Sequence, residues 1–433
     1  MISLPLYSNA KDPDPGLPIE PRAEFQTPAF LHLLWQQVIA HHPQALSQTE
    51  LIRAAGSDLK IAEQSFYPTP SLVVERVESQ AVIDRAYAGS SQVSTLRVQQ
   101  PLWTGGRLTA QLSKAVISEQ IETERLQEVK QSLALKTLQA WLEVVSTQRQ
   151  QMVLQDALQI QSGLLQKISQ RASLGYSAES EVKLSQWRIA QAKHDMSLTA
   201  LQEQLAWLRL KQWVPEVAVL LQNWKQEDSP RPHGQGHVLP LPRLDWESLC
   251  LSQSPTLQRM ANVAAYQRAE VIEKRALLQP EVYVRLEHQQ GNFTYANTAG
   301  VNRLFVGMTA STGAGLSLQH QLATLNLKQE STKQETEAAQ RALLETIQSE
   351  LLNINVRQSK VETLQANLKS AHDIQGAWQR QFEAGRKSWI DVVNAVKETS
   401  QAELAIIDND IALQLSYWRL QVMAFGVIHW KPV

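Results

Sequence analysis

The chain lacks long apolar runs, has one cysteine and carries almost no net charge. A membrane-spanning helix needs about 18 consecutive apolar residues, but the longest aliphatic stretch, Val217–Leu221, is far shorter, so such a helix is excluded. A lone cysteine, Cys250, excludes an internal disulfide and a thiolate metal cluster. We expect it to be a small buried apolar residue. With 41 basic and 42 acidic residues, the composition offers no basic surface for nucleic acid.

The N-terminal segment also lacks an apolar core of the kind found in secretory signals. Residues Met1–Gln26 contain five prolines and no apolar h-region. The segment is therefore not a secretory signal as it stands. If the protein is exported, we expect a signal that was removed or that lies upstream of this start.

Motifs that carry enzymatic chemistry are also absent. The histidines at 41, 42, 288 and 320 do not have the spacing of a helical metal site. The glycine-rich stretch Thr312–Gly315 is not followed by Lys-Ser/Thr, and no G-x-S-x-G elbow occurs. The twelve tryptophans are scattered, which is typical of interface or membrane-belt residues. The sequence therefore predicts no catalytic, cofactor or metal site.

The most informative feature is an internal duplication. Pro43 and Pro68 recur as Pro255 and Pro280, each 212 residues later, and Gly175 recurs as Gly385, 210 residues later. These ordered matches divide the chain into an irregular segment (1–27), a first repeat (28–213), a proline-rich connector (214–245), a second repeat (246–426) and a short tail (427–433).

Each repeat is predicted to contain the same elements in the same order. A helix ends at a proline, two strands form a hairpin, a very long helix follows, and a shorter helix returns after a glycine turn. In the first repeat we expect these elements at Pro28–Phe66, Ser71–Glu78, Val93–Leu102, Arg107–Arg171 and Ala178–Trp213. In the second repeat we expect them at Trp246–Leu278, Glu281–Gln289, Phe305–Leu322, Ala323–Glu383 and Ser388–Phe425.

The strands and the long helices have distinct apolar patterns. The strands alternate, so that one set of side chains opposes another; the apolar set includes Leu96, Val98, Val282, Val284 and Leu286, and the polar set includes Thr95, Arg97, Gln99, Tyr283, Arg285 and Glu287. In the long helices, apolar residues recur at coiled-coil spacing, as in Ile347, Ile354, Val361 and Leu368 and in Leu135, Leu138, Leu142 and Val145. A helix of this length, on the order of 90 Å, needs partner helices along its apolar seam.

Each glycine turn is followed six residues later by a carboxylate. Glu181 follows Gly175, and Asp391 follows Gly385. One interpretation is that the acid stabilises the start of the returning helix. The other requires a symmetric oligomer, in which each acid becomes a ring of like charge that selects cations or resists opening.

Together these features resemble the TolC family of outer-membrane channels over about residues 28–426. The resemblance rests on three motifs at the ends of the long helices: Gln100-Pro101-Leu102-Trp103-Thr104-Gly105-Gly106-Arg107, Gln170-Arg171-Ala172-Ser173-Leu174-Gly175, and Gln381-Phe382-Glu383-Ala384-Gly385 followed by Ile390-Asp391-Val392-Val393. The second repeat departs from the family pattern where its long helix begins, with His320-Gln321-Leu322-Ala323.

The resemblance implies a mainly α fold with β hairpins, and a homotrimer. Each chain would contribute four strands to a 12-stranded barrel in outer-membrane lipid and its helices to a periplasmic α-barrel. The glycine turns would form the periplasmic tips that meet an adaptor, through Leu174, Gly175, Tyr176, Ala384, Gly385 and Arg386. The aperture residues would be Asp391, Asn394 (where some members have a second acid), Lys387 and Glu181, the last two as a latch.

The motif from Gln100 to Arg107 and the residues after it resemble the type I secretion branch, especially adhesin-exporting (LapE-like) channels. That branch implies an ABC transporter in the inner membrane, a membrane-fusion adaptor and an exported protein substrate. Two alternatives stay open. One is the outer-membrane channel of a drug or metal efflux pump driven by protons, and the other is a soluble coiled-coil scaffold. The expected location of the duct is the outer membrane, extending into the periplasm.

Overall fold

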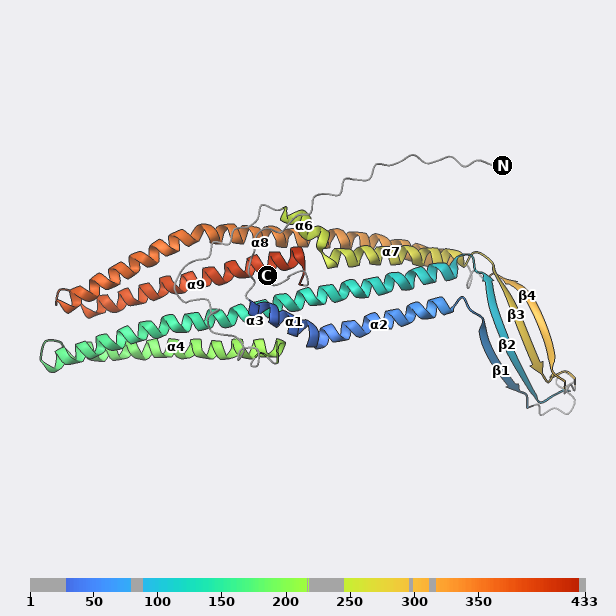
Figure 1. Cartoon of the computed structure of the whole chain (residues 1–433), viewed down its shortest axis with the longest axis horizontal. Helices are drawn as coiled ribbons and strands as arrows, with labels where there is room; N and C mark the ends of the chain where they lie inside the picture. Colours follow the sequence, from blue (N-terminus) through green and yellow to red (C-terminus); the bar gives the residue numbers. More distant parts are fainter. Residues whose placement is uncertain are drawn as a thin grey trace, which may run out of the picture.

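The protein is an elongated assembly of long helices with a small β-sheet at one end (Figure 1). The computed structural model describes residues 29–78, 89–215, 217, 245–295, 299–310 and 317–427. The predicted N-terminal segment, nearly all of the connector 214–245 and the Gly-rich stretch 312–315 lie outside these described residues.

The two repeats fold into matching elements in the predicted order. The first repeat consists of α1 (Ala29–His41), α2 (Pro43–Gln64), β1 (Thr69–Arg76), β2 (Gln92–Trp103), α3 (Arg107–Ser173) and α4 (Glu179–Trp213). The second consists of α6 (Trp246–Gln253), α7 (Pro255–Ala276), β3 (Glu281–Gln290), β4 (Val301–Thr309), α8 (Ser317–Glu383) and α9 (Trp389–Phe425). The long helices α3 and α8 have the same length, 67 residues.

The first predicted helix of each repeat is in fact two helices, so the prediction of one continuous helix was wrong. The breaks fall at His42 and Ser254, each of which precedes a proline and has an extended backbone. Proline forces this conformation on the residue before it and is itself well suited to the first helical position. Both breaks are also capped, because His42 Nδ1 accepts from the Gln44 amide at 3.2 Å and Ser254 Oγ from the Leu257 amide at 3.4 Å.

The last predicted strand was wrong as well. It was expected over Phe305–Leu322, but β4 ends at Thr309 and α8 already includes Ser317. Leu318 and Leu325 are both buried and seven residues apart. They therefore extend the apolar seam of the long helix toward the sheet, and a strand would place them differently.

The four strands form one antiparallel sheet in the order β1-β2-β3-β4, which joins the two repeats through β2 and β3. The register confirms the predicted alternation, since Arg97 lies opposite Glu287 while Val98 lies opposite Leu286. One face is apolar and exposed in the single chain, with fractional exposures of 47% to 75% for Leu72, Val74, Leu96, Leu286, Leu304, Val306 and Met308. The other face carries the polar set.

The main core lies near the middle of the molecule, where α1 and α6 pack against the long helices (Figure 1). Its largest fully buried side chains include Trp35, Leu138 and Tyr417. The Trp35 indole is satisfied within the core, because Nε1 donates to the Ala134 carbonyl at 3.0 Å. The predicted seam is buried here too, with Ile347 and Ile354 fully enclosed.

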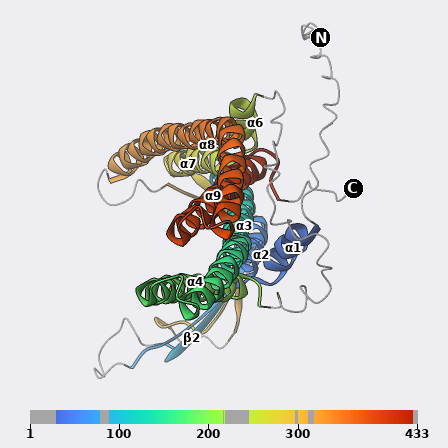
Figure 2. The ribbon, with the colours of Figure 1, turned by 90° about the vertical axis from the view of Figure 1, so that its left-hand side faces the viewer.

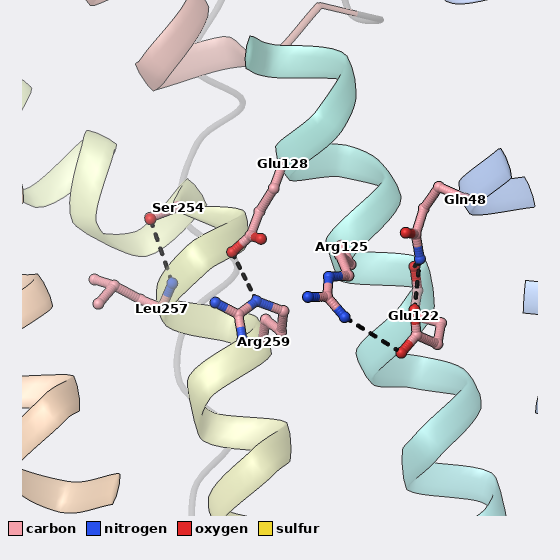
Figure 3. Close-up of polar contacts among 7 residues, drawn as sticks. All are labelled: Gln48, Glu122, Arg125, Glu128, Ser254, Leu257 and Arg259. Atoms are coloured by element: carbon pink, nitrogen blue, oxygen red, sulfur yellow. Dashed lines mark hydrogen bonds and ion pairs between the residues drawn. The ribbon is translucent and has the colours of Figure 1, made fainter. Parts of the chain in front are cut away.

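Between the core and the sheet, α2 and α7 pack on α3 and are fixed by polar contacts (Figure 3). Gln48 of α2 donates to a Glu122 carboxylate oxygen of α3 at 2.6 Å. Arg259 of α7 lies 2.9 Å from Glu128, six residues further along α3. The helix α3 therefore holds the equivalent helices of both repeats.

Candidate functional site

The candidate site is the pair of helical hairpins at the end of the molecule opposite the sheet (Figure 1). One hairpin joins α3 to α4 and the other joins α8 to α9. Viewed toward this end, the two hairpins lie next to each other (Figure 2). All of the predicted tip and aperture residues lie in these turns or in the first two turns of α4 and α9.

Both turns have the same backbone geometry. Gly175 and Gly385 have φ values of +78° and +72°, which L side chains rarely adopt. The amide of the next residue returns to the carbonyl five residues back, Tyr176 to Arg171 and Arg386 to Gln381, each at 2.8 Å. The glycine amide also bonds three residues back, which completes a Schellman motif. The predicted glycine turns are confirmed as tight helix terminators.

The tip residues differ in chemistry between the two hairpins. In the first turn, Leu174 and Tyr176 are 70% and 81% exposed. In the second turn, Ala384 and Arg386 stand at the corresponding positions and are also exposed. The first tip therefore exposes two large, mainly apolar side chains, whereas the second exposes a small side chain and a positive charge.

The acids that follow the turns lie in the first turns of the returning helices. Glu179 and Glu181 begin α4, and Asp391 begins α9. Of these two returning helices, α9 has a side-chain cap, in which Ser388 Oγ accepts from the Ile390 amide at 3.3 Å, and α4 has none. The position of these acids agrees with the helix-start interpretation, because the positive end of the helix dipole favours negative charge there.

Lys387 lies in the turn between α8 and α9 and contacts both of these helices in the single chain. Its Nζ lies 3.5 Å from Asp391 Oδ2 and 4.4 Å from the centre of the Trp378 ring. Both partners of the ion pair are about one-third exposed. A Lys387–Glu181 latch would therefore have to replace this contact. Asn394 is exposed on α9, three residues after Asp391.

A second set of contacts joins the two hairpins, and the sequence did not predict it. Arg171 of α3 stacks on Phe382 of α8 at 4.5 Å and donates to the Phe382 carbonyl at 3.1 Å. Lys167 lies 2.5 Å from Glu383, and its hydrogen bond and charge lower the pKa of that carboxyl. In the sequence, Lys167 and Arg171 have the pattern of basic residues at a helix end, which does not reveal a partner more than 200 residues away.

Next to these contacts, a small apolar core lies at the base of the two hairpins. It consists of Leu164, Ile168, Phe382, Trp389, Val392 and Val393. Because α3, α8 and α9 all contribute to it, the two hairpins share one base. The bases of the two hairpins are therefore packed together within the chain, while their outermost residues remain exposed.

Outside the tips, the groups with possible chemistry have structural partners. His42 stacks on Trp213 with ring centres 5.4 Å apart, and His288 Nδ1 lies 2.6 Å from Asn302 Oδ1. Cys250 is buried, as predicted, and burial raises the pKa of its thiol to about 11. Among the described residues, no three histidine, cysteine or carboxylate side chains gather closely enough to hold a metal ion. Within the same residues, no helix is both long and apolar enough to cross a membrane.

Comparison with known proteins identifies the fold. No protein-family model matches the sequence, and no curated protein matches it. Among solved structures, the outer membrane protein VceC of Vibrio cholerae aligns with a TM-score of 0.76 at 14% identity, over 92% of this chain and 96% of that one. The Campylobacter jejuni outer membrane channel CmeC aligns with a TM-score of 0.71 at 15% identity, over 97% of this chain and 94% of that one.

A third similar structure is CusC, described for its folding and transmembrane channel formation, with a TM-score of 0.75 at 13% identity over 93% of both chains. The alignments span both repeats and nearly the full length of each neighbour. The chain therefore has the TolC-like fold of outer-membrane channels, which confirms the predicted fold class.

Proposed function

We propose that the chain is one subunit of a homotrimeric outer-membrane duct. The observation that carries this proposal is the sheet. Its apolar face is exposed in the single chain, its opposite face is polar, and its outer strands β1 and β4 each have one edge without a strand partner among the described residues. Exposed edges and a broad apolar face are both unfavourable in water.

A trimer would pair the exposed strand edges and cover the apolar face. Joining β1 of one subunit to β4 of the next gives twelve antiparallel strands in a closed barrel, which has no edges. The apolar face would then meet lipid, and the polar face would line a wet lumen. The long helices would continue the duct into the periplasm and end at the hairpin tips.

The tips supply the periplasmic end of the duct. Asp391 would form a ring of three carboxylates around the axis, and Lys387 and Glu181 would link neighbouring helices when the aperture is closed. Leu174, Gly175, Tyr176, Ala384, Gly385 and Arg386 would meet a periplasmic membrane-fusion adaptor. A passive duct needs no catalytic residue, so we propose that the protein is not an enzyme and that an inner-membrane partner supplies the energy.

We further propose that the duct serves type I secretion, with an ABC transporter as partner and a large adhesin as the exported protein. The support is the resemblance of the motif from Gln100 to Arg107 to that branch. Gly105 and Gly106 of this motif form the turn between β2 and α3, with φ values of +61° and +88°. The alternative is a drug or metal efflux channel. Deleting the gene separates them: loss of surface adhesin supports secretion, and increased drug or metal sensitivity supports efflux.

A pore assay tests the duct itself. We expect the protein to give heat-modifiable trimers in outer-membrane fractions and stable conductance in planar bilayers. A soluble elongated dimer would instead support the scaffold alternative.

For the latch, Lys387→Ala combined with Glu181→Ala should raise single-channel conductance, and unchanged conductance would exclude it. Lys183→Ala, on the same helix as Glu181 and paired with Glu179, is the matched control.

A further inference from the structure

A single carboxylate on the polar face of the sheet is surrounded by three arginines. Glu287 of β3 is only 8% exposed in its side chain. Its Oε2 lies 3.0 Å from Arg97 Nε and 3.8 Å from Arg285 Nε, and its Oε1 lies 3.7 Å from Arg303 Nη1. We call these four residues the arginine cluster.

The strand register produces this arrangement. Arg97 of β2 and Arg303 of β4 lie directly opposite Glu287 on its two sides, and Arg285 precedes it by two residues on the same face. Side chains that are paired across strands, or two apart along one strand, share a face. The three guanidinium groups are therefore brought together by three different strand positions.

Two of the arginines also have a second contact. Arg303 donates to Gln289 Oε1 at 2.6 Å. Arg285 stacks on Phe305 at 4.5 Å, and its Nε is buried without a hydrogen-bond partner. All three arginine side chains remain between 27% and 43% exposed. The guanidinium groups are thus held in place, yet part of each faces solvent.

The cluster carries more positive charge than its carboxylate neutralises. One arginine suffices to pair with Glu287, so two positive charges remain. Of the other strand acids on this face, Glu281 is paired with Arg107. Glu75 lies opposite Val93 of β2, and Val93 is four residues from Arg97 along that strand. The separation along the strand is therefore about 13 Å. That separation exceeds the Debye length of about 8 Å at physiological salt, so Glu75 compensates the cluster little within its own chain.

We propose that the arginine cluster is an anion-binding and anion-selecting site in the lumen of the duct. This inference rests on the proposed function, in which the polar face lines the lumen and three copies surround it. Guanidinium groups bind carboxylate and phosphate oxygens in bidentate geometry, and rings of arginine favour anions in pores. The site would therefore attract chloride weakly and would bind oxyanions with more than one charge more strongly.

The test uses the purified trimer in planar bilayers. In a KCl gradient, the reversal potential gives the chloride-to-potassium permeability ratio, and added pyrophosphate tests oxyanion binding by blocking the current. For Arg285→Gln with Arg303→Gln we expect the ratio to fall by about twofold or more, and the half-blocking pyrophosphate concentration to rise by about fivefold or more. Arg285→Lys with Arg303→Lys keeps the charge and should change the ratio little.

Arg76→Gln is the matched control, because by its register Arg76 belongs to the same sheet but to the apolar face. It should leave both measurements unchanged. If the double glutamine variant fails to assemble, Arg303→Gln alone must shift both in the same direction by less, with Arg97 still holding Glu287. Pores of normal conductance with unchanged selectivity and block would overturn the inference but not the duct. Absence of any pore from the wild-type trimer would overturn the proposed function itself.

Discussion

Arg149 Nη1 lies 2.6 Å from Asp410 Oδ2, in an ion pair that joins the first repeat to the second through α3 and α9. Both side chains are about nine-tenths buried, with 10% and 11% exposure. Gln414 donates a further hydrogen bond to the same carboxylate oxygen at 3.1 Å. The pair lies between the main core and the hairpin tips, where α3 and α9 pack against each other.

Removing one partner of this pair should destabilise the protein strongly. Asp410→Ala leaves the Arg149 charge buried and unpaired, which typically costs about 3–5 kcal/mol. Arg149→Met combined with Asp410→Leu removes both charges and should recover most of that loss. Denaturant unfolding of the detergent-solubilised protein measures both variants. Equal stability of Asp410→Ala and the wild type would show that the pair contributes nothing.

The tip glycines and the glycine within α3 should respond in opposite directions to alanine. At Gly175 an added Cβ meets nothing within 4 Å, so Gly175→Ala costs only the left-handed backbone conformation, about 1 kcal/mol. Gly163 is helical and also has open space around it, so Gly163→Ala should stabilise by about 0.5–1 kcal/mol. Thermal unfolding compares them, and a shift in the same direction would contradict the turn assignment.

Changing the charge at Asn394, a neutral residue of the proposed aperture, should change the ion selectivity of the pore. Asn394 is exposed three residues beyond Asp391, so Asn394→Asp adds a second ring of carboxylates in a trimer. We expect a higher potassium-to-chloride permeability ratio, and a lower ratio for Asp391→Asn, because like charges around a pore concentrate counterions. Reversal potentials measure both. Opposite or absent shifts would remove these residues from the aperture.

The single thiol should be unreactive in the folded protein. Burial raises the pKa of Cys250 from 9.0 to about 11. At pH 8 this lowers the thiolate fraction about 100-fold, before the restricted access of the reagent is counted. A chromogenic disulfide reagent should therefore modify Cys250 only after denaturation. Rapid labelling of the native protein would place the thiol at an accessible surface instead.

The raised pKa of Cys250 also predicts that the protein is less stable at alkaline pH. Above pH 9 the unfolded thiol begins to ionise while the folded thiol remains protonated, so the unfolded state binds fewer protons and the free energy of unfolding falls as pH rises toward 11. Burial raises the pKa of Tyr417 in the same direction and adds to this effect. Denaturant unfolding at pH 8 and pH 10.5 measures it. Cys250→Ala should remove only the thiol part.

The features that the sequence predicted correctly are those with a local signal. A glycine at a helix end and a two-residue alternation each depend on a few neighbouring residues, so the turns at Gly175 and Gly385 and the faces of Arg97 and Glu287 could be inferred. The break at His42 was missed because the apolar pattern continues across it. The final strand was predicted to end too late, because the residues after Phe305 alternate in polarity before the helix-forming residues of α8 begin.

The contacts between repeats could not be predicted from the sequence. Arg149 and Asp410 are 261 residues apart, and Arg171 and Phe382 are 211 apart. Each of these arginines has the ordinary pattern of a solvated helical residue. Only the packing of α3 on α9 and the contact between the ends of α3 and α8 give these arginines their partners. The arginine cluster was visible only in part, because the sequence placed Arg97, Arg285 and Glu287 on one face but not Arg303 beside them.

The equal lengths of α3 and α8 have a mechanical consequence. From Leu138 in the main core to Gly175 at the tip, α3 extends about 55 Å, and the small core under the tips ties both hairpins together. Because this small core joins the hairpins, a rotation of α3 about the main core would move both of them together. A rotation of about 5° would carry the tips about 5 Å sideways, close to the pitch of one helical turn.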